Sequence, residues 1–175
     1  MDILITQIDG KMPNLALMRL SHYHKNQGDS VFFTRNLSSN NNYDKVYASS
    51  IFDFSKPKLD RFKERYPNAV IGGTGINNPT VTVEKEIGPY YKYDYSIYPE
   101  FKNSIGFTQR GCRLKCPFCV VPKKEGKNRS VNTIYDIWRG EPYPRKLYLL
   151  DNDFFGQPED QWKERIKELN PESRD

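Results

Sequence analysis

The sequence predicts an α/β protein in which short strands alternate with helices and pair mostly in parallel. Three observations lead to this expectation. Short apolar runs of strand length alternate with longer segments whose apolar residues recur at helical spacing. Glycine, proline or clusters of polar residues follow most of these segments and mark their ends. Aromatic residues make up 14% of the chain and can supply a core, although the mean hydropathy is only −0.80.

The first half of the chain predicts a small Rossmann-like unit over residues 1–78. Its helix after Pro13 carries Ala16, Leu20 and Tyr23 on one face and stops at Gly28. The expected elements are, in chain order, strand 2–8, helix 14–27, strands 30–34 and 44–52, helix 56–67 and strand 68–75. This order of elements is typical of a parallel sheet covered by helices.

The second half predicts a connector followed by two further strand–helix units. Residues 79–103 are rich in proline, tyrosine and charge, which indicates a segment lying over the surface. The elements expected after it are strand 104–109, helix 130–139 capped by Asn132 or Ser130, strand 145–153 and helix 157–169. In the last helix we expect Trp162, Ile166 and Leu169 to face a core.

Composition narrows the compartment and the partners. The N-terminus has no basic segment followed by an apolar run, and no apolar run is long enough to span a bilayer, so we expect a cytoplasmic protein without membrane contact. The net charge of +5 fits a nucleic-acid partner or a solvated basic surface, and both interpretations stay open. An odd number of cysteines argues against a disulfide framework.

All cysteines of the chain lie in one short segment, as Cys112, Cys116 and Cys119, with the spacing C-x3-C-x2-C. Thiolates are soft ligands that favour zinc or an iron–sulfur cluster. A structural zinc site needs a fourth ligand, and His22 and His24 lie on a distant predicted helix. A cluster with three cysteine ligands leaves one iron open for a substrate or cofactor. A zinc site with an outside ligand and simple free thiols remain alternatives.

The segment "GCRLKCPFC" resembles the cluster-binding motif of the radical S-adenosylmethionine enzymes. In that motif three cysteines hold a 4Fe–4S cluster and an aromatic residue precedes the last cysteine, the position of Phe118 here. The resemblance implies that S-adenosylmethionine binds the open iron and is cleaved reductively to methionine and a 5′-deoxyadenosyl radical. It also implies an electron donor such as flavodoxin or ferredoxin, and it names no substrate.

The same resemblance implies a fold for residues 104–175, namely the first βα units of a partial TIM-type barrel. In the family, the loop after the second strand contacts the methionine part of the cofactor. Asp151 and Asn152 follow the strand "LYLL", so we expect them to be cofactor neighbours, although the chain lacks a Gly-Gly-Glu motif there. Capping of the helix that follows is the alternative role for these side chains.

The first half resembles the cobalamin-binding-type domain that precedes the barrel in many of these enzymes, through residues 4–31 and 69–75. The D-x-H-x-x-G signature of a cobalt-ligating histidine is absent from the sequence. We therefore expect a domain that supports the fold; binding of cobalamin without a protein ligand is the alternative. The glycines of "GGTG" (72–75) could let backbone amides approach a phosphate, or could form a tight turn out of the sheet.

Two further alternatives concern the chain as a whole. The family's barrel has more βα units than residues 104–175 supply, so we expect a missing C-terminal portion, self-association or a partner chain to complete it, or else an inactive truncated relic. A non-catalytic zinc or iron–sulfur module, binding nucleic acid through the basic loop, is the other hypothesis. The basic residues near the cysteines are Arg110, Arg113, Lys115, Lys123, Lys124, Lys127 and Arg129.

Overall fold

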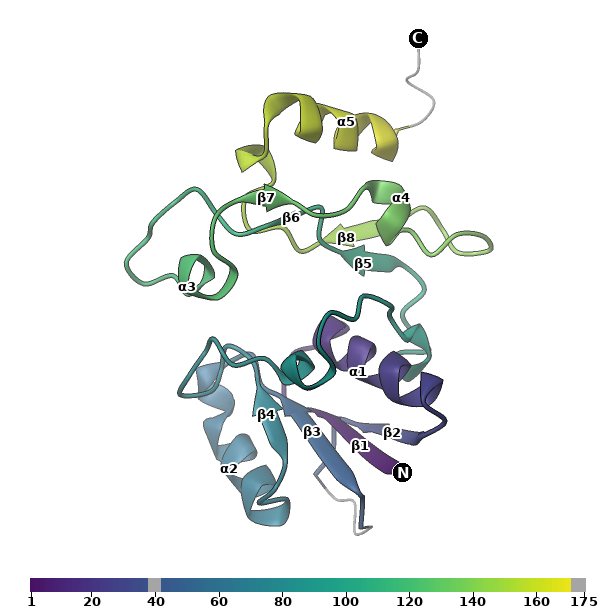
Figure 1. Ribbon diagram of the computed structural model, residues 1–175, viewed down its shortest axis with the longest axis vertical. Coiled ribbons are helices and arrows are strands. Elements are labelled where there is room, and N and C mark those ends of the chain that lie inside the picture. The colour runs from purple at the N-terminus through teal and green to yellow at the C-terminus, as the bar shows by residue number, and fades with distance from the viewer. Residues whose placement is uncertain (38–41, 171–175) are drawn as a thin grey trace. The chain divides into compact units, whose positions relative to one another are not determined.

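The computed structural model describes residues 1–37 and 42–170. The chain divides into two compact units, Met1–Pro99 and Glu100–Asp175. The first unit is built on a four-stranded parallel sheet of order β2-β1-β3-β4 (Figure 1). Its elements are β1 (Asp2–Gln7), α1 (Leu15–Asn26), β2 (Ser30–Thr34), β3 (Lys45–Ser49), α2 (Lys56–Arg65) and β4 (Val70–Gly72). The α/β class and the parallel sheet predicted from the sequence are confirmed, and this sheet is compatible with the expected Rossmann-like unit.

The two helices of this unit cover opposite faces of the sheet. Leu59 and Phe62 of α2 pack against Ile8 and Ala48. Side chains alternate along a strand, so Tyr47 points to the other face, where its hydroxyl contacts His24 of α1. Burial on both faces explains why β1 reads as a nearly continuous apolar run in the sequence.

Asn14 determines where α1 begins. Its side-chain oxygen accepts hydrogen bonds from the backbone amides of Ala16 and Leu17, at 3.1 and 3.3 Å, which is the usual arrangement of an N-cap. Its side-chain nitrogen donates to the Ser49 hydroxyl at 2.9 Å. The cap therefore also ties the start of the helix to the carboxyl end of β3.

The segment expected to be a surface connector is largely part of the first unit. Residues 79–99 form two short 3-10 turns, Val83–Ile87 and Tyr95–Ile97, and bury Val83 and Tyr98. The Tyr98 hydroxyl donates to Oε1 of Gln7 at 2.8 Å. The apolar residues of 79–99 show no regular spacing, so the sequence pattern did not predict that they pack against the sheet.

The glycines of 72–75 allow two backbones to approach each other closely. Gly73 has φ +115°, and a Cβ atom there would lie 2.0 Å from the carbonyl oxygen of Ser50. Its amide donates to Val81, and the Gly75 amide donates to Ser50, both at 3.0 Å. Since these amides are already engaged, the tight turn is the interpretation that the structure favours for this segment.

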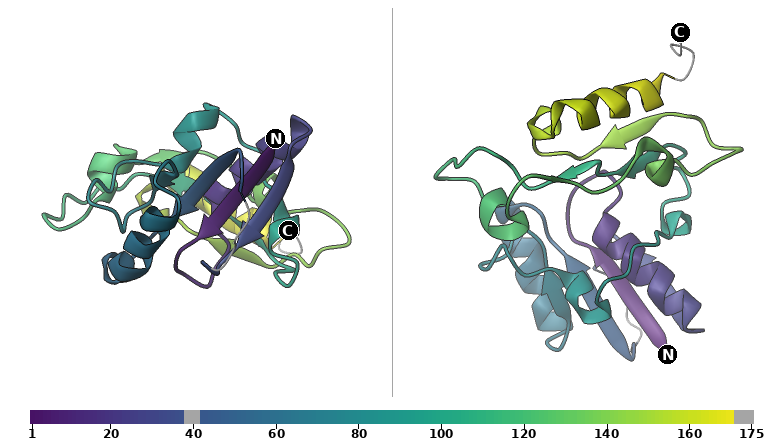
Figure 2. Two further views of the ribbon diagram at one scale, coloured as in Figure 1. Left: turned by 90° about the horizontal axis from the view of Figure 1, so that it is seen from below. Right: turned by 45° about the horizontal axis from the view of Figure 1, so that its top comes forward.

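The second unit consists of short elements: β5 (Ser104–Gly106), β6 (Gln109–Arg110), α3 (Val121–Glu125), β7 (Arg129–Ser130), α4 (Ile134–Ile137), β8 (Leu147–Leu149) and α5 (Glu159–Leu169). β5 pairs with β8 in parallel, and β6 pairs with β7 in antiparallel orientation. Figure 2 shows α5 running beside β8. A parallel pair joined through α4 is compatible with a βα unit, and the partial barrel stays a prediction.

The boundaries of α4 differ from the expectation. Its N-cap is Thr133, where Asn132 or Ser130 was expected, because Thr133 and Asp136 form a reciprocal capping box. The hydroxyl of Thr133 accepts from the Asp136 amide at 3.1 Å, and the Asp136 carboxylate accepts from the Thr133 amide at 2.8 Å. The helix ends at Ile137, two residues before the end expected from the sequence.

The orientation of α5 also departs from the prediction. Ile166 and Leu169 are 42% and 40% exposed, whereas Glu168 is buried at 8%. The Glu168 carboxylate accepts from the Ile134 amide at 2.8 Å and pairs with Arg165 at 2.9 Å. The hydrogen bond from the start of α4 to Glu168 therefore determines which face of α5 is buried in this unit. The apolar spacing along α5 does not determine it.

Asp94 predicts how the stability of the first unit depends on pH. Burial raises its pKa, but the hydrogen bonds from Lys25, Ser21 and Ser96 outweigh burial and hold the pKa at about 2. A depressed carboxylate pKa stabilises the fold above the unfolded-state value and loses that contribution as the pH falls. We expect the free energy of unfolding to drop by about 1–2 kcal/mol between about pH 4 and pH 2 on account of this group.

Chemical denaturation of wild type and Asp94→Asn across this pH range measures the effect. The variant should be less stable at neutral pH and should show a shallower loss on acidification. Asp60→Asn, at a side chain that is 51% exposed, is the matched control and should follow wild type. Parallel pH profiles for wild type and Asp94→Asn would contradict the assignment.

Candidate functional site

The cysteines lie in a loop of residues 111–128, here called the cysteine loop, which connects β6 to β7. The antiparallel pairing of Gln109 with Ser130 and of Arg110 with Arg129 brings the two ends of this loop together. All three thiols are free and partly buried. The sequence analysis placed them on one loop, and the structure adds the hydrogen-bonded strand pair that closes it.

Gly111 begins the cysteine loop in a conformation that excludes a side chain. Its φ is +79°, and a Cβ atom would lie 2.3 Å from the carbonyl oxygen of Lys127. Its amide donates to Oε2 of Glu125 at 2.9 Å. Both contacts reach the far end of the loop, so a close backbone approach accounts for glycine immediately before the first cysteine.

Gln109, which the sequence analysis did not select, fixes the path of the chain into the loop. It is fully buried, and its amide nitrogen donates to the carbonyl oxygens of Arg110 and Gly111 at 2.8 and 2.6 Å. Its side-chain oxygen accepts from the Asp153 amide at 3.2 Å. This side chain therefore links the start of the cysteine loop to the loop after β8.

Gln7 performs the same task in the first unit. Its amide nitrogen donates to the carbonyl oxygens of Asp9, Gly10 and Met12 at 2.9, 3.0 and 3.0 Å. Both glutamines follow a threonine and are followed by a glycine two or three residues later, in "TQIDG" and "TQRG". This shared Thr-Gln pattern is the signal by which the sequence could have identified Gln109.

Asp153 joins the two ends of the cysteine loop. Its Oδ2 accepts from the Arg113 amide at 3.2 Å and from the Asn128 side chain at 3.3 Å. The Arg113 guanidinium pairs with the same oxygen at 3.3 Å, and the Cys112 sulfur lies 3.9 Å from it. The Asp153 side chain is 10% exposed, so a nearly buried carboxylate holds the start of the loop to its end.

Glu125 makes a second closure. Besides the Gly111 amide, its carboxylate pairs with Arg110 at 3.1 Å and accepts from the side chain of Asn152 at 2.9 Å. Its side chain is also 10% exposed. Glu125 lies among lysines in "KKEGK", so its role was not apparent from the basic character of this segment.

The three predicted cofactor neighbours lie in different surroundings. The Asp151 carboxylate accepts hydrogen bonds from the amides of Thr108 and Gln109, at 2.8 and 3.0 Å, and from the Thr108 hydroxyl. It therefore fixes the turn between β5 and β6. Asn152 is bonded to Glu125, and Phe118 is 92% exposed at the tip of the cysteine loop. Their contact with a cofactor stays a prediction.

Two of the three sulfur atoms accept hydrogen bonds from backbone amides. Cys112 Sγ accepts from the Leu114 amide at 3.4 Å, and Cys119 Sγ accepts from the Val121 amide at 3.5 Å. Such bonds to sulfur are among the contacts that tune iron–sulfur centres. Within residues 1–37 and 42–170, however, no three His, Cys, Asp or Glu side chains are grouped closely enough to hold a metal ion. Three-thiol ligation therefore requires the tip of the loop to rearrange.

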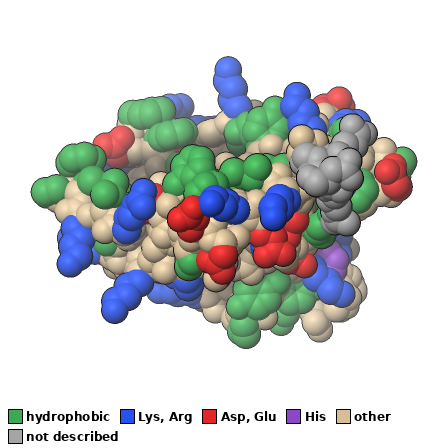
Figure 3. Space-filling model, turned by 90° about the horizontal axis from the view of Figure 1, so that it is seen from above, with side chains coloured by type: hydrophobic (Ala, Val, Ile, Leu, Met, Phe, Trp, Pro, Cys, Tyr) green, Lys and Arg blue, Asp and Glu red, His purple; other side chains and the backbone are tan. Residues whose placement is uncertain are grey.

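The basic residues of the loop divide into two groups. The guanidinium groups of three arginines are engaged: Arg110 pairs with Glu125, Arg113 pairs with Asp153, and Arg129 donates to the Glu125 carbonyl. Lys115, Lys123 and Lys127 are exposed. On the face of the molecule in Figure 3, cationic side chains are interspersed with acidic ones.

Both histidines have partners inside the first unit. His22 Nδ1 lies 2.6 Å from the Tyr90 hydroxyl. His24 Nδ1 lies 2.7 Å from Asp29, and its Nε2 lies 3.0 Å from the Tyr47 hydroxyl. A role as metal ligand would require His24 to give up one of these contacts.

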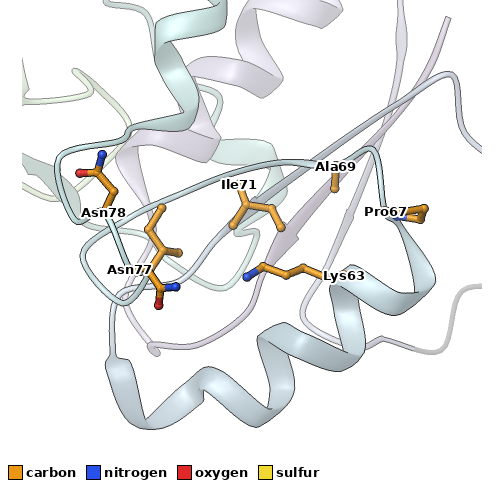
Figure 4. A pocket seen from close by; sticks show the side chains of 7 residues that line it. Lys63, Pro67, Ala69, Ile71, Asn77 and Asn78 are labelled. Atoms are coloured by element: carbon orange, nitrogen blue, oxygen red, sulfur yellow. The ribbon is translucent and has the colours of Figure 1, made fainter.

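A groove of about 550 Å³ lies in the first unit, beside the edge strand β4 (Figure 4). Its walls are mainly apolar, with one cationic and two amide side chains. The lining residues are Lys63, Pro67, Ala69, Ile71, Ile76, Asn77 and Asn78. With neither thiol nor imidazole in its lining, the groove offers none of the chemistry of the cysteine loop.

Comparisons of the chain with protein-family models, with curated proteins and with solved structures find no match. None of the helices in the described part of the chain combines the length and the apolar character needed to cross a bilayer.

Gly111 supplies a test of loop closure. Replacement by alanine should force the chain away from the Lys127 carbonyl and destabilise the second unit by about 3 kcal/mol. Gly126 is the matched control: its φ is +78°, but no described atom lies within 4 Å of an added Cβ. With ψ at −148°, Gly126→Ala should cost only the backbone strain, about 1–3 kcal/mol, and less than Gly111→Ala, which adds a steric clash.

Hydrogen exchange of the amides in 104–130 reports these costs for the second unit separately from the first. Equal protection losses in the two variants would show that the Gly111–Lys127 approach is not required.

Proposed function

We propose that the second unit binds a 4Fe–4S cluster through Cys112, Cys116 and Cys119 and acts as a radical S-adenosylmethionine enzyme. The observation that carries this proposal is the set of three free thiols on one loop whose base is closed by hydrogen-bonded strands and buried carboxylates. The residues between the thiols, such as Leu114 and Phe118, are exposed. Few contacts oppose movement of the tip, whereas many hold its base.

The donor set fits the cluster better than zinc. Three soft ligands from one loop match a cubane with one iron left open, while a closed zinc site requires a fourth ligand. The histidines that could supply one already have partners in the first unit. When bound, the cluster supplies one electron to S-adenosylmethionine, which splits into methionine and a 5′-deoxyadenosyl radical that takes a hydrogen atom from the substrate.

The remaining residues of the site bind and orient. The parallel strands β5 and β8 end at neighbouring positions, since the Leu150 amide donates to Gly106 at 2.8 Å. Ligands of α/β proteins bind at the carboxyl ends of parallel strands. Asp151, Asn152 and Phe118 follow these ends or lie in the adjoining loop, and we assign them to the S-adenosylmethionine side of the site. The substrate stays unassigned.

The partner that we propose is an acidic one-electron donor of the flavodoxin or ferredoxin class. Lys115, Lys123 and Lys127 are exposed on the cysteine loop, while the arginines are engaged in closing it. Positive charge around a redox site steers a negatively charged partner and raises the association rate. The first unit supports the fold in this proposal and carries no histidine ligand for cobalt.

Anaerobic reconstitution with iron and sulfide tests the function. Wild type should take up about four iron atoms per chain and show a paramagnetic resonance signal, when reduced, that S-adenosylmethionine alters. It should then form 5′-deoxyadenosine under dithionite. The variant with all three cysteines replaced by serine should bind no cluster, yet its melting temperature should stay within about 3 °C of metal-free wild type, because carboxylates and strands close the loop.

Other results would replace the proposal. Tight uptake of zinc without iron, with unfolding when zinc is removed, would identify a structural metal module. A complete cluster that never yields 5′-deoxyadenosine would identify an inactive relative of the enzymes.

A further inference from the structure

One carboxylate oxygen of the second unit contacts residues from both ends of the cysteine loop. Oδ2 of Asp153, in the loop after β8, meets the amide and guanidinium of Arg113, the side-chain amide of Asn128 and the sulfur of Cys112. This oxygen lies 3.9 Å from the Cys112 sulfur. The carboxylate of Asp151 instead accepts from Thr108 and Gln109, and the side chain of Asn152 donates to Glu125.

The surroundings of Asp153 leave space for this carboxylate. Gly156 lies directly behind it, and a Cβ atom there would come within 2.1 Å of Asp153 Oδ2 and 2.2 Å of Asn128 Nδ2. Any side chain at position 156 would therefore displace the carboxylate, the amide or both. Independently of the hydrogen bonds, the lack of a side chain at Gly156 is therefore required for the observed position of the Asp153 carboxylate.

We propose that Asp153 is a positioning residue for the first sulfur ligand, Cys112, and that Gly156 makes room for it. By binding the Arg113 amide and the Asn128 side chain together, the carboxylate fixes the backbone that carries Cys112 before any metal arrives. Groups that orient a metal ligand without touching the metal commonly determine the affinity of the site. This inference rests on the proposed role of Cys112 as a ligand.

The charge at this position is balanced locally. A nearly buried carboxylate is costly unless it is paired, and the Arg113 guanidinium pairs with it from the solvent side. Glu125 differs from Asp153, because it closes the same loop through the Gly111 amide, Arg110 and Asn152. Closure of the loop and orientation of Cys112 are therefore separable in variants.

Titration of the full, metal-free chain with Co²⁺ under anaerobic conditions tests the proposal, because thiolate-to-cobalt charge-transfer absorbance reports both affinity and the number of thiolates bound. Asp153→Ala and Gly156→Ala should weaken cobalt binding about 10- to 100-fold and lower the absorbance per cobalt. Asp153→Asn should stay within about 3-fold of wild type, since an amide oxygen can accept the same N–H bonds. Asp160→Asn, at an exposed position on α5, is the control and should match wild type.

A purely structural role predicts a different pattern. In that case the absorbance per bound cobalt would be unchanged in Asp153→Ala, any loss of affinity would follow the loss of thermal stability, and Glu125→Gln would behave alike. That pattern, or wild-type affinity and absorbance in Asp153→Ala, would overturn the proposal. Rescue by asparagine together with a lower thiolate signal in alanine supports it.

The outcome is separable from that of the proposed function. Wild type that binds cobalt through its thiols, but forms no iron–sulfur cluster, would remove the enzymatic proposal and leave the role of Asp153 intact. Wild type that binds neither cobalt nor iron would overturn both.

Discussion

Two nearly buried carboxylates, Asp153 and Glu125, hold the base of the cysteine loop, and the arrangement of the candidate site depends on them. A buried carboxylate must find donors or a cationic partner, because leaving it unpaired costs several kcal/mol, on the order of a large part of a domain's stability. Asp153 satisfies this requirement with groups from both ends of the loop, and Glu125, near the end of the loop, satisfies it with groups at the start. The hydrogen bonds and ion pairs that satisfy these carboxylates therefore also restrict the backbone that carries the thiols.

This constraint assigns different tasks to the base and the tip of the loop. At the base, Gly111 and Gly156 leave space only for backbone or for a carboxylate, so little movement is tolerated there. At the tip, Leu114 and Phe118 are exposed and make few contacts. In the proposed function, the tip of this loop would bring its sulfur atoms together around a metal centre without unfolding the strands that support it.

The two units share a feature, a buried glutamine at the end of β1 in the first unit and at the start of β6, shortly after β5, in the second. Gln7 and Gln109 are both buried, and both use a side-chain amide to satisfy the carbonyl groups of the loop that follows. Buried carbonyl groups need hydrogen-bond donors, and glutamine reaches several from one position. In each unit the loop beyond the strand is therefore held by the protein itself, at the edge of a parallel sheet where ligands usually bind.

The sequence by itself determined the α/β class, the approximate position of most helices and strands, and the spacing of the three thiols. These features depend on local periodicity and on residues that are close in the chain. Only the tertiary structure decided that Asp153, rather than Asp151 or Asn152, meets a cysteine, that Glu125 closes the loop, and that α5 is anchored by Glu168. Asp153 and Cys112 are 41 positions apart, and their meeting depends on how β5 pairs with β8, which no local pattern encodes.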